Sequence, residues 1–425
     1  MGRMQPIIDG LSRRHLLALG ATATASLALP GCVRDRQPDA ARSVALPVAA
    51  DPTPVALAGV PRGGSPQMVA KAVRDAALGV DGLAWLSRGD TVLVKVASNS
   101  GNEYPATTDP VAVRAMVELL LEHGAARVVV ADMSGVQFVR FWKDGLRGST
   151  RALMHENGIA RAAGEAGAQV HAFEEAGWDG FFEERPTVAG TWAGPVMLPA
   201  VLREVDHVVL MPRCSRHVLA GSTLGLKSAV GWWRHDSRLE YHRDAATFSE
   251  KTADANTVPT IRAKQRLVLT SATRLLTTFG PDQGYAHEPE TGLVFASPSV
   301  VAHDMVSLAW LLEGRLATPE GTRYGPLDDP NGWPLFVNVA NRVVTAWLGG
   351  LGEAMRMERL DRYDMHAVWD DRVLRRAFST GGGIPRVALV PTNDALPAAL
   401  RERMHGLVTP AASLASRGSG AASSM

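Results

Sequence analysis

The stretch TVLVKVASNSGNEYPATTDPVAVRAMVELLLEHGAARVVVAD, residues 91–132, decides the fold class. Its opening TVLVKV is a β-branched run, which is typical of a strand buried in a parallel sheet. Asp109 then predicts the start of a helix, and residues 113–121 carry apolar side chains at helical spacing. Gly124 predicts the end of that helix, and residues 127–132 form a second strand-like run. This order predicts a right-handed β-α-β unit.

The same alternation continues along the chain. Further strand-like runs lie at residues 207–211, 266–270, 293–296 and 387–390. With helical patterns between them, they predict a layered α/β fold, with a mostly parallel sheet, flanking helices and two lobes. Ligands of such sheets bind beyond the carboxyl ends of the strands, which here are followed by Asn99, Asp132 and Ser134.

The N-terminus has the pattern of an export signal. Arg13 and Arg14 precede an apolar run over residues 16–29, which is too short to span a membrane. We predict that residues 1–31 are a twin-arginine signal peptide, so that the twin-arginine translocase is a partner during export. Cys32 follows the run as a lipidated cysteine does, and cleavage nearby without lipid is the alternative. The expected location is the periplasm or the outer side of the membrane, with a lipid anchor.

The remaining segments differ in composition. Residues 32–54 are polar and Pro-rich and predict a flexible tether, and the Ser-, Ala- and Gly-rich residues 411–425 predict a disordered tail. Between them we expect an α/β core over residues 55–315 and a C-terminal extension, helical or α/β, over residues 316–410.

Charge and cysteine content exclude several classes of protein. The formal net charge of +1 and the 20% of charged residues give no indication of a nucleic-acid partner. Cys32 and Cys214 are the two cysteines of the sequence and are far apart. An iron–sulfur cluster and a four-cysteine zinc site are therefore excluded.

Candidate chemistry concentrates in residues 213–244, RCSRHVLAGSTLGLKSAVGWWRHDSRLEYHRD. Imidazoles act as general acids, general bases and metal ligands near neutral pH. A lysine beside a glycine turn can bind an anion, or act as a nucleophile if it is desolvated. We therefore take His217, Lys227 and His242 as catalytic candidates. The alternatives are structural histidines and a solvated lysine in the first turn of a helix.

Candidate ligand-binding residues lie in the expected glycine turn or at strand and helix ends. They are Gly221, Ser222, Thr223, Gly225, Lys227, Asn99, Asp132, Ser134 and Asp304. The backbone N–H groups after the turn are expected to favour an anionic ligand. His242 and His235 are the candidate metal ligands, and a solvated loop is the alternative for His235. A helix cap is the alternative for Asp304.

These motifs together resemble the domain-of-unknown-function 362 family over about residues 55–315. The resemblance is carried by residues 92–95, 106–110, 128–132, 223–227, 280–297 and 301–304. Many members carry a ferredoxin-like cysteine cluster that this chain lacks. Where the family has an acidic residue after the strand at 266–270, this chain has Ser271-Ala272-Thr273.

A more local similarity links this chain to the nickel-dependent lactate racemases. His217, Gly221, Gly225, Lys227 and His242 occur in the order and similar spacing of that family's motif. The resemblance implies that Lys227 holds a nickel pincer cofactor covalently, that His242 ligates the metal, and that His217 is an acid/base. The turn here reads Ser-Thr-Leu-Gly instead of a glycine run, and no histidine occupies residues 132–137.

Two functions follow from these patterns. The first is an exported enzyme for a small anionic or hydroxylated substrate, assisted by a metal or a pincer cofactor in the manner of a racemase or epimerase. The second is a periplasmic accessory protein that binds a small-molecule ligand or a metal without turnover.

Overall fold

The computed structural model describes residues 46–322, 334–361, 363 and 365–410. The predicted signal peptide, Cys32 and the predicted tail therefore lie outside the described residues. Within the described part, an eight-stranded sheet has the order β16-β1-β15-β12-β9-β2-β3-β6. In that order the strands are Ile384–Pro391, Val48–Pro61, Thr291–Ser297, Gln265–Ala272, His207–Met211, Thr91–Val96, Arg127–Asp132 and Gln169–Ala172.

Strand β15 runs antiparallel to both of its neighbours, and the other neighbouring pairs of this sheet are parallel. The smaller strands are β4 (Arg140–Trp142), β5 (Gly145–Arg147), β7 (Phe181–Glu184), β8 (Val196–Pro199), β10 (Ser215–His217), β11 (Gly221–Thr223), β13 (Leu275–Leu276) and β14 (Ala286–His287). The prediction of a mostly parallel α/β fold is confirmed.

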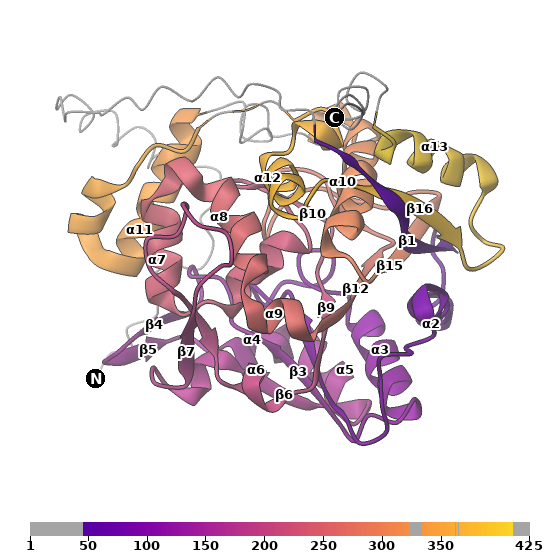
Figure 1. Cartoon of the computed structure of the whole chain (residues 1–425), viewed down its shortest axis with the longest axis horizontal. Helices are drawn as coiled ribbons and strands as arrows, with labels where there is room; N and C mark the ends of the chain where they lie inside the picture. Colours follow the sequence, from indigo (N-terminus) through magenta and orange to yellow (C-terminus); the bar gives the residue numbers. More distant parts are fainter. Residues whose placement is uncertain (1–45, 323–333, 362, 364, 411–425) are drawn as a thin grey trace, which may run out of the picture.

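Helices cover both faces of the sheet (Figure 1). They are α2 (Pro66–Asp81), α3 (Pro110–Glu122), α4 (Thr150–Glu156), α5 (Ile159–Glu165), α6 (Val201–Glu204), α7 (His235–Arg243), α8 (Phe248–Asp254), α9 (Pro259–Lys264), α10 (Val300–Leu316), α11 (Pro334–Arg356), α12 (Arg372–Thr380) and α13 (Ala398–Val408). The 3-10 helix η3 spans Leu226–Trp232. None of the described helices is long and apolar enough to cross a membrane.

The predicted β-α-β unit is formed by β2, α3 and β3. Asp109 caps α3 as expected, because its carboxylate accepts a hydrogen bond from the backbone N–H of Val111 at 2.9 Å. Strands β2 and β3 pair in parallel from Thr91–Arg127 to Lys95–Ala131.

Alternation along β2 assigns its side chains to two layers. Val92, Val94 and Val96 are buried in the layer that contains α2, α3 and α5. Leu93 is buried in the opposite layer. Because successive side chains of a strand point to opposite faces, Lys95 points into the same layer as Leu93, where the polar site lies.

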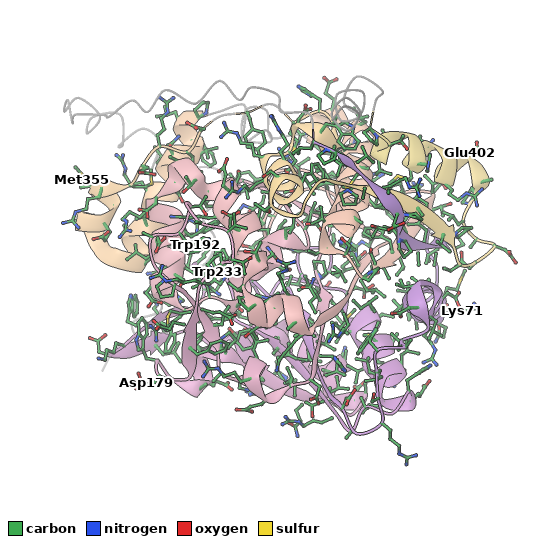
Figure 2. The ribbon with its side chains drawn as sticks, in the orientation of Figure 1. Lys71, Asp179, Trp192, Trp233, Met355 and Glu402 are labelled. Carbon is green, nitrogen blue, oxygen red and sulfur yellow. The ribbon has the colours of Figure 1, made fainter. Side chains whose placement is uncertain are left out.

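Aromatic side chains fill much of this opposite layer. Trp192 and Trp233 lie edge to face with ring centroids 5.0 Å apart. Figure 2 shows this pair inside the body, whereas Lys71 and Met355 lie at its rim. Burial of large rings on this side fixes the positions of η3 and α7, which carry Lys227 and His242.

Both ends of the described chain contribute to the main sheet. Strand β16, from the predicted C-terminal extension, pairs in parallel with β1. Strand β1 begins at Val48, inside the segment predicted as a tether. Backbone pairing with β16 explains this difference, because pairing does not require the apolar pattern that residues 48–54 lack.

Candidate functional site

Three parallel strands bring three polar loops to one edge of the sheet. Strand β2 lies between β3 and β9, and all three run in the same direction. Ser98, after β2, donates its backbone N–H to Asp132 at the end of β3, at 2.6 Å. The hydroxyl of Ser134 donates to the carbonyl oxygen of Ser98. The loops at Asn99, Asp132 and Ser134 therefore lie together, as the strand order predicts.

Asp132 forms a buried ion pair with Lys95. The Lys95 Nζ and Asp132 Oδ1 atoms are 2.7 Å apart, and the side chains are 1% and 4% exposed. Burial lowers the pKa of Lys95, and the charge of Asp132 opposes that shift. A Cβ at Gly231 would come within 2.4 Å of both Asp132 Oδ1 and Lys95 Nζ, so a glycine is required there.

The prediction of a glycine turn from Gly221 to Gly225 is wrong. Residues Gly221–Thr223 form strand β11, which pairs antiparallel with β10 and places Gly221 opposite His217. The turn lies between these strands, and its backbone N–H groups at Leu219 and Ala220 donate to His217 Nδ1 at 3.1 and 3.3 Å. Ser222 and Thr223 are thus buried strand residues.

The prediction that backbone N–H groups at the start of the following helix bind an anionic ligand also needs correction. The backbone N–H groups of Gly225 and Leu226 donate to the Asp304 carboxylate at 2.8 and 2.7 Å. His303 Nδ1 lies 2.8 Å from the same carboxylate. The anion that these N–H groups favour is supplied by the chain itself. Ser299 caps α10, so Asp304 does not cap its own helix and instead accepts the N–H groups at the start of η3.

Lys227, on η3, is not a solvated surface lysine. Its side chain keeps some accessible surface, yet burial and the charges of Arg213 and Arg238 lower its pKa to about 7. Asp282 opposes this shift with its negative charge. A substantial fraction of Lys227 is therefore a neutral amine at neutral pH, which is the nucleophilic form.

The two candidate catalytic histidines lie within electrostatic reach of Lys227. Burial is the main reason that the pKa of His217 lies well below its usual value, and the charge of Lys227 lowers it further. Burial lowers the pKa of His242 to about 3, the hydrogen bond that the ring donates to Asn341 opposes this shift, and the charge of Lys227 adds to it. His217, Lys227 and His242 are therefore close enough to one another for their charges to interact.

His235 is separated from this group. Its Nε2 lies 3.1 Å from the carbonyl oxygen of Val139, and its ring packs edge-on against Phe141. His235 and His242 are two turns apart on α7, or about 10 Å along the axis. That separation is too large for both to ligate one metal ion at bond lengths of about 2 Å. The described part of the chain contains no cluster of three or more His, Cys, Asp or Glu that could hold a metal.

Arg213 and Arg238 are site residues that the sequence patterns did not single out. Arg213, just after β9, is 3% exposed and donates Nη1 to the carbonyl oxygen of Pro281 at 2.6 Å. Its Nε is buried and has no hydrogen-bond partner among the described residues. Arg238 donates to the carbonyl oxygens of Ser134 and Met133 at 2.6 and 2.8 Å. The strand-end rule could have found Arg213, whereas nothing local marks Arg238.

Asp282 was likewise not predicted as a site residue. Asn99 donates its side-chain N–H to the Asp282 carboxylate, and Asn102 donates to the Asp282 backbone carbonyl at 3.0 Å. Burial raises the pKa of Asp282, and the charge of Arg213 counters that rise. Asn99 is therefore a partner of this carboxylate.

The site carries an excess of positive charge. Among the described residues of the site, the four bases Lys95, Arg213, Lys227 and Arg238 face the three acids Asp132, Glu174 and Asp282. Burial lowers the pKa of Arg213 and of Arg238 to about 10, and nearby aspartates oppose both shifts. Mutual repulsion between bases in a region of low dielectric is relieved by a bound anion.

A separate cavity of about 180 Å³ lies at the opposite edge of the sheet. Its walls include Arg127, at the amino end of β3, and His171 on the edge strand β6. None of Lys227, His217 and His242 lines this cavity, so it is separate from the candidate site.

Fold and site together define an α/β protein with a buried cluster of basic side chains near the carboxyl ends of parallel strands. The family model of the Domain of unknown function (DUF362) matches residues 92–309, just over half of the 425 residues. The chain belongs to this family, as its motifs predict. No curated protein matches the chain.

Among solved structures, the chain is similar to the lactate racemase apoprotein from Thermoanaerobacterium thermosaccharolyticum. The sequence identity is 15% and the TM-score is 0.32. The similarity covers 52% of this chain and 50% of that chain, so this chain spans half the length of that structure.

Proposed function

We propose that this protein is an enzyme that acts on a small anionic, hydroxylated substrate in the pocket around Lys227. The observation that carries the proposal is the excess positive charge of this buried cluster, where burial and the charges of two arginines lower the pKa of Lys227 to about 7. Arg213 supports it, because a buried guanidinium N–H without a partner is costly unless a ligand accepts its hydrogen bond.

In the proposed mechanism, Arg213 and Lys227 bind the anionic group and orient the rest of the substrate between the histidines. The imidazoles of His217 and His242 exchange protons with the substrate's hydroxyl group or with the carbon that bears it. Arg238 has its guanidinium engaged by backbone carbonyls, so it contributes charge and holds the loop after β3 in place. Removal of a proton from that carbon and return of a proton to it, in one step or two, is the chemistry of a racemase or epimerase.

A covalently held pincer cofactor fits part of this donor set. Lys227 offers an amine that is partly neutral at pH 7, and one ring nitrogen of His242 has no hydrogen-bond partner among the described residues. We therefore propose Lys227 as the attachment point and His242 as the metal ligand. When bound, such a group would supply a hydride acceptor. A metal held by protein side chains alone has no support in the described residues.

The test begins with protein purified under native conditions. Intact mass and peptide mapping measure any group attached to Lys227, and elemental analysis measures bound metal. The purified protein is then incubated in D₂O with a panel of small 2-hydroxy acids, and deuterium at carbon 2 is measured by mass spectrometry. Inversion at carbon 2 is measured in parallel by chiral chromatography, because a hydrogen that moves as hydride does not exchange with D₂O. We expect inversion with wild-type protein, with deuterium exchange where the hydrogen moves as a proton, and neither with Lys227→Ala.

Lys71→Ala is the matched control, because Lys71 is 72% exposed and far from the strand ends. It should exchange deuterium at the wild-type rate. Absence of inversion and of exchange with every acid, together with unchanged binding of inorganic phosphate by wild-type and Arg213→Gln proteins, would contradict the proposal.

A binding protein without turnover is the second candidate. It is favoured by the low pKa of His242, about 3, since so weak a base accepts a proton poorly at neutral pH. Anion binding that depends on Arg213, with no inversion or exchange at carbon, would support this candidate over the enzyme.

We also propose that the protein acts outside the cytoplasm, in the periplasm or anchored to the membrane by lipid on Cys32. This proposal rests on the paired arginines and the apolar run in residues 13–29. Export of a folded protein through the twin-arginine route would allow a cofactor to be attached before translocation.

A further inference from the structure

Asn341 is a buried polar residue of α11 that holds His242 by two hydrogen bonds. Its side chain is 0% exposed. The Asn341 Oδ1 atom lies 2.6 Å from His242 Nδ1, and Asn341 Nδ2 donates to the His242 backbone carbonyl at 2.7 Å. Asn341 lies outside the segment matched by the family model.

The orientation of this amide is determined by its surroundings. Asn341 Nδ2 faces two acceptors, the His242 carbonyl oxygen and, at 3.2 Å, the sulfur of Met357. A flipped amide would set its oxygen against both acceptors, so Oδ1 must face the histidine ring. Because an amide oxygen only accepts hydrogen bonds, Nδ1 of His242 carries the proton and Nε2 carries the lone pair.

His217 has the reverse arrangement. Its Nδ1 accepts hydrogen bonds from the backbone N–H groups of Leu219 and Ala220, at 3.1 and 3.3 Å. A nitrogen that accepts from N–H groups carries no proton, so the proton of the neutral ring is on Nε2. The Nε2 atoms of His217 and His242 have no hydrogen-bond partner among the described residues.

We propose that the fold holds His217 and His242 in opposite tautomers, with Asn341 as the positioning residue that sets the tautomer of His242. His217 then offers an Nε2–H donor and His242 offers an Nε2 acceptor. One imidazole is prepared to donate a hydrogen bond to substrate, and the other to accept a proton or to ligate a metal. This proposal deepens the proposed function and rests on it for the substrate, although the tautomers themselves do not.

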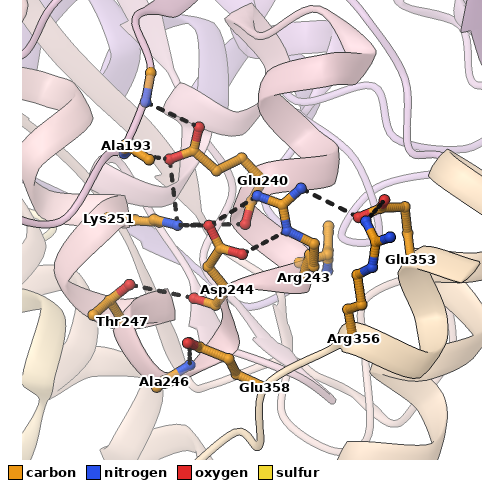
Figure 3. A network of polar contacts seen from close by, with 12 residues as sticks. Ala193, Glu240, Arg243, Asp244, Ala246, Thr247, Lys251, Glu353, Arg356 and Glu358 are labelled. Atoms are coloured by element: carbon orange, nitrogen blue, oxygen red, sulfur yellow. Dashed lines mark hydrogen bonds and ion pairs between the residues drawn. The ribbon is translucent and has the colours of Figure 1, made fainter.

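A network of charged residues holds α11 against α7 (Figure 3). Arg243, next to His242, pairs with Asp244 at 2.7 Å and with Glu353 of α11 at 3.2 Å. Lys251 of α8 is 0% exposed and lies 3.2 Å from the Asp244 carboxylate. These contacts tie α7, α8 and α11 together, so the Asn341 amide is kept in register with the ring that it orients.

The tautomers are measured by long-range ¹H–¹⁵N correlation spectra of full-length protein labelled with ¹⁵N-histidine, without substrate at neutral pH. His217→Gln and His242→Gln identify the two spin systems. We expect a protonated Nε2 and bare Nδ1 for His217, and the reverse for His242. Asn341→Leu should convert the His242 signals to those of a mixture of the two tautomers, and Asn341→Asp should keep Nδ1 of His242 protonated.

Asn338→Leu is the matched control. Asn338 lies one turn earlier on α11 and bonds to the backbone of Leu360 and Pro334, so its loss perturbs the helix without touching His242. It should leave the His242 tautomer unchanged. Wild-type His242 with a protonated Nε2, or wild-type His217 with a protonated Nδ1, would overturn the proposal. Because the spectra need no turnover, failure of the enzyme assay would leave this result intact.

Discussion

Replacement of Lys227 by Met should make the protein more stable while it abolishes ligand or cofactor retention. The fold lowers the pKa of Lys227 from 10.5 to about 7, mainly by burial. Each pKa unit corresponds to about 1.4 kcal/mol, so the charged lysine lowers the free energy of unfolding by as much as about 5 kcal/mol below pH 7. Met fills a similar volume and has no charge to desolvate.

The sign of the pH dependence follows from proton binding. Between about pH 7 and pH 10.5 the unfolded chain binds more protons at Lys227 than the folded chain does, so the contribution of this residue to stability rises with pH. The advantage of Lys227→Met should therefore be about 5 kcal/mol at pH 6 and shrink to about 2 kcal/mol at pH 9.

Denaturant unfolding followed by tryptophan fluorescence at pH 6 and pH 9 measures both differences. Lys71→Met is the control, because Lys71 is 72% exposed, and its effect should stay within about 0.5 kcal/mol at both pH values. The reasoning is refuted if Lys227→Met is no more stable than wild type at pH 6, or if its advantage is the same at both pH values. A solvated lysine, the alternative that the sequence left open, would have little effect on stability, and the burial of Lys227 reverses that expectation.

Three further perturbations test the remaining features. Asp132→Asn should lower the free energy of unfolding by about 3–5 kcal/mol, because it leaves Lys95 buried and unpaired. Denaturant unfolding should show that adding Lys95→Met restores much of the lost stability, and no recovery would count against the buried pair. Asp304→Asn should cost about 1–3 kcal/mol and speed amide hydrogen exchange at the start of η3, and unchanged exchange there would contradict the cap. Arg13→Lys combined with Arg14→Lys should leave precursor in the cytoplasm on fractionation, and normal export would argue against the twin-arginine route.

Local patterns were sufficient for the β-α-β unit. Its strands have β-branched runs, and Asp109 at the start of α3 is a cap that acts within a few residues of chain. Parallel pairing then places Asn99, Asp132 and Ser134 on one edge, since strands linked by a helix run in the same direction.

Local patterns failed at the hairpin before Lys227. Gly221 and Gly225 suggest a turn, because glycine is permissive at positive φ. In the structure Gly221 has a φ of 77° at the start of a strand, and Gly225 is a glycine because a Cβ would come 2.6 Å from the Asp304 carboxylate. That second reason depends on a residue on another helix, which no window of sequence contains.

What the sequence by itself determined is the class of fold, the edge of the sheet that carries polar loops, and the presence of His217, Lys227 and His242 in one segment. What only the tertiary structure decided is their chemical state. Electrostatic and hydrogen-bonding effects act through space over several ångströms, so the pKa of Lys227 depends on Arg213 and Asp282, and the His242 ring depends on an amide of α11. These partners come from separate parts of the chain and meet only when the layers pack.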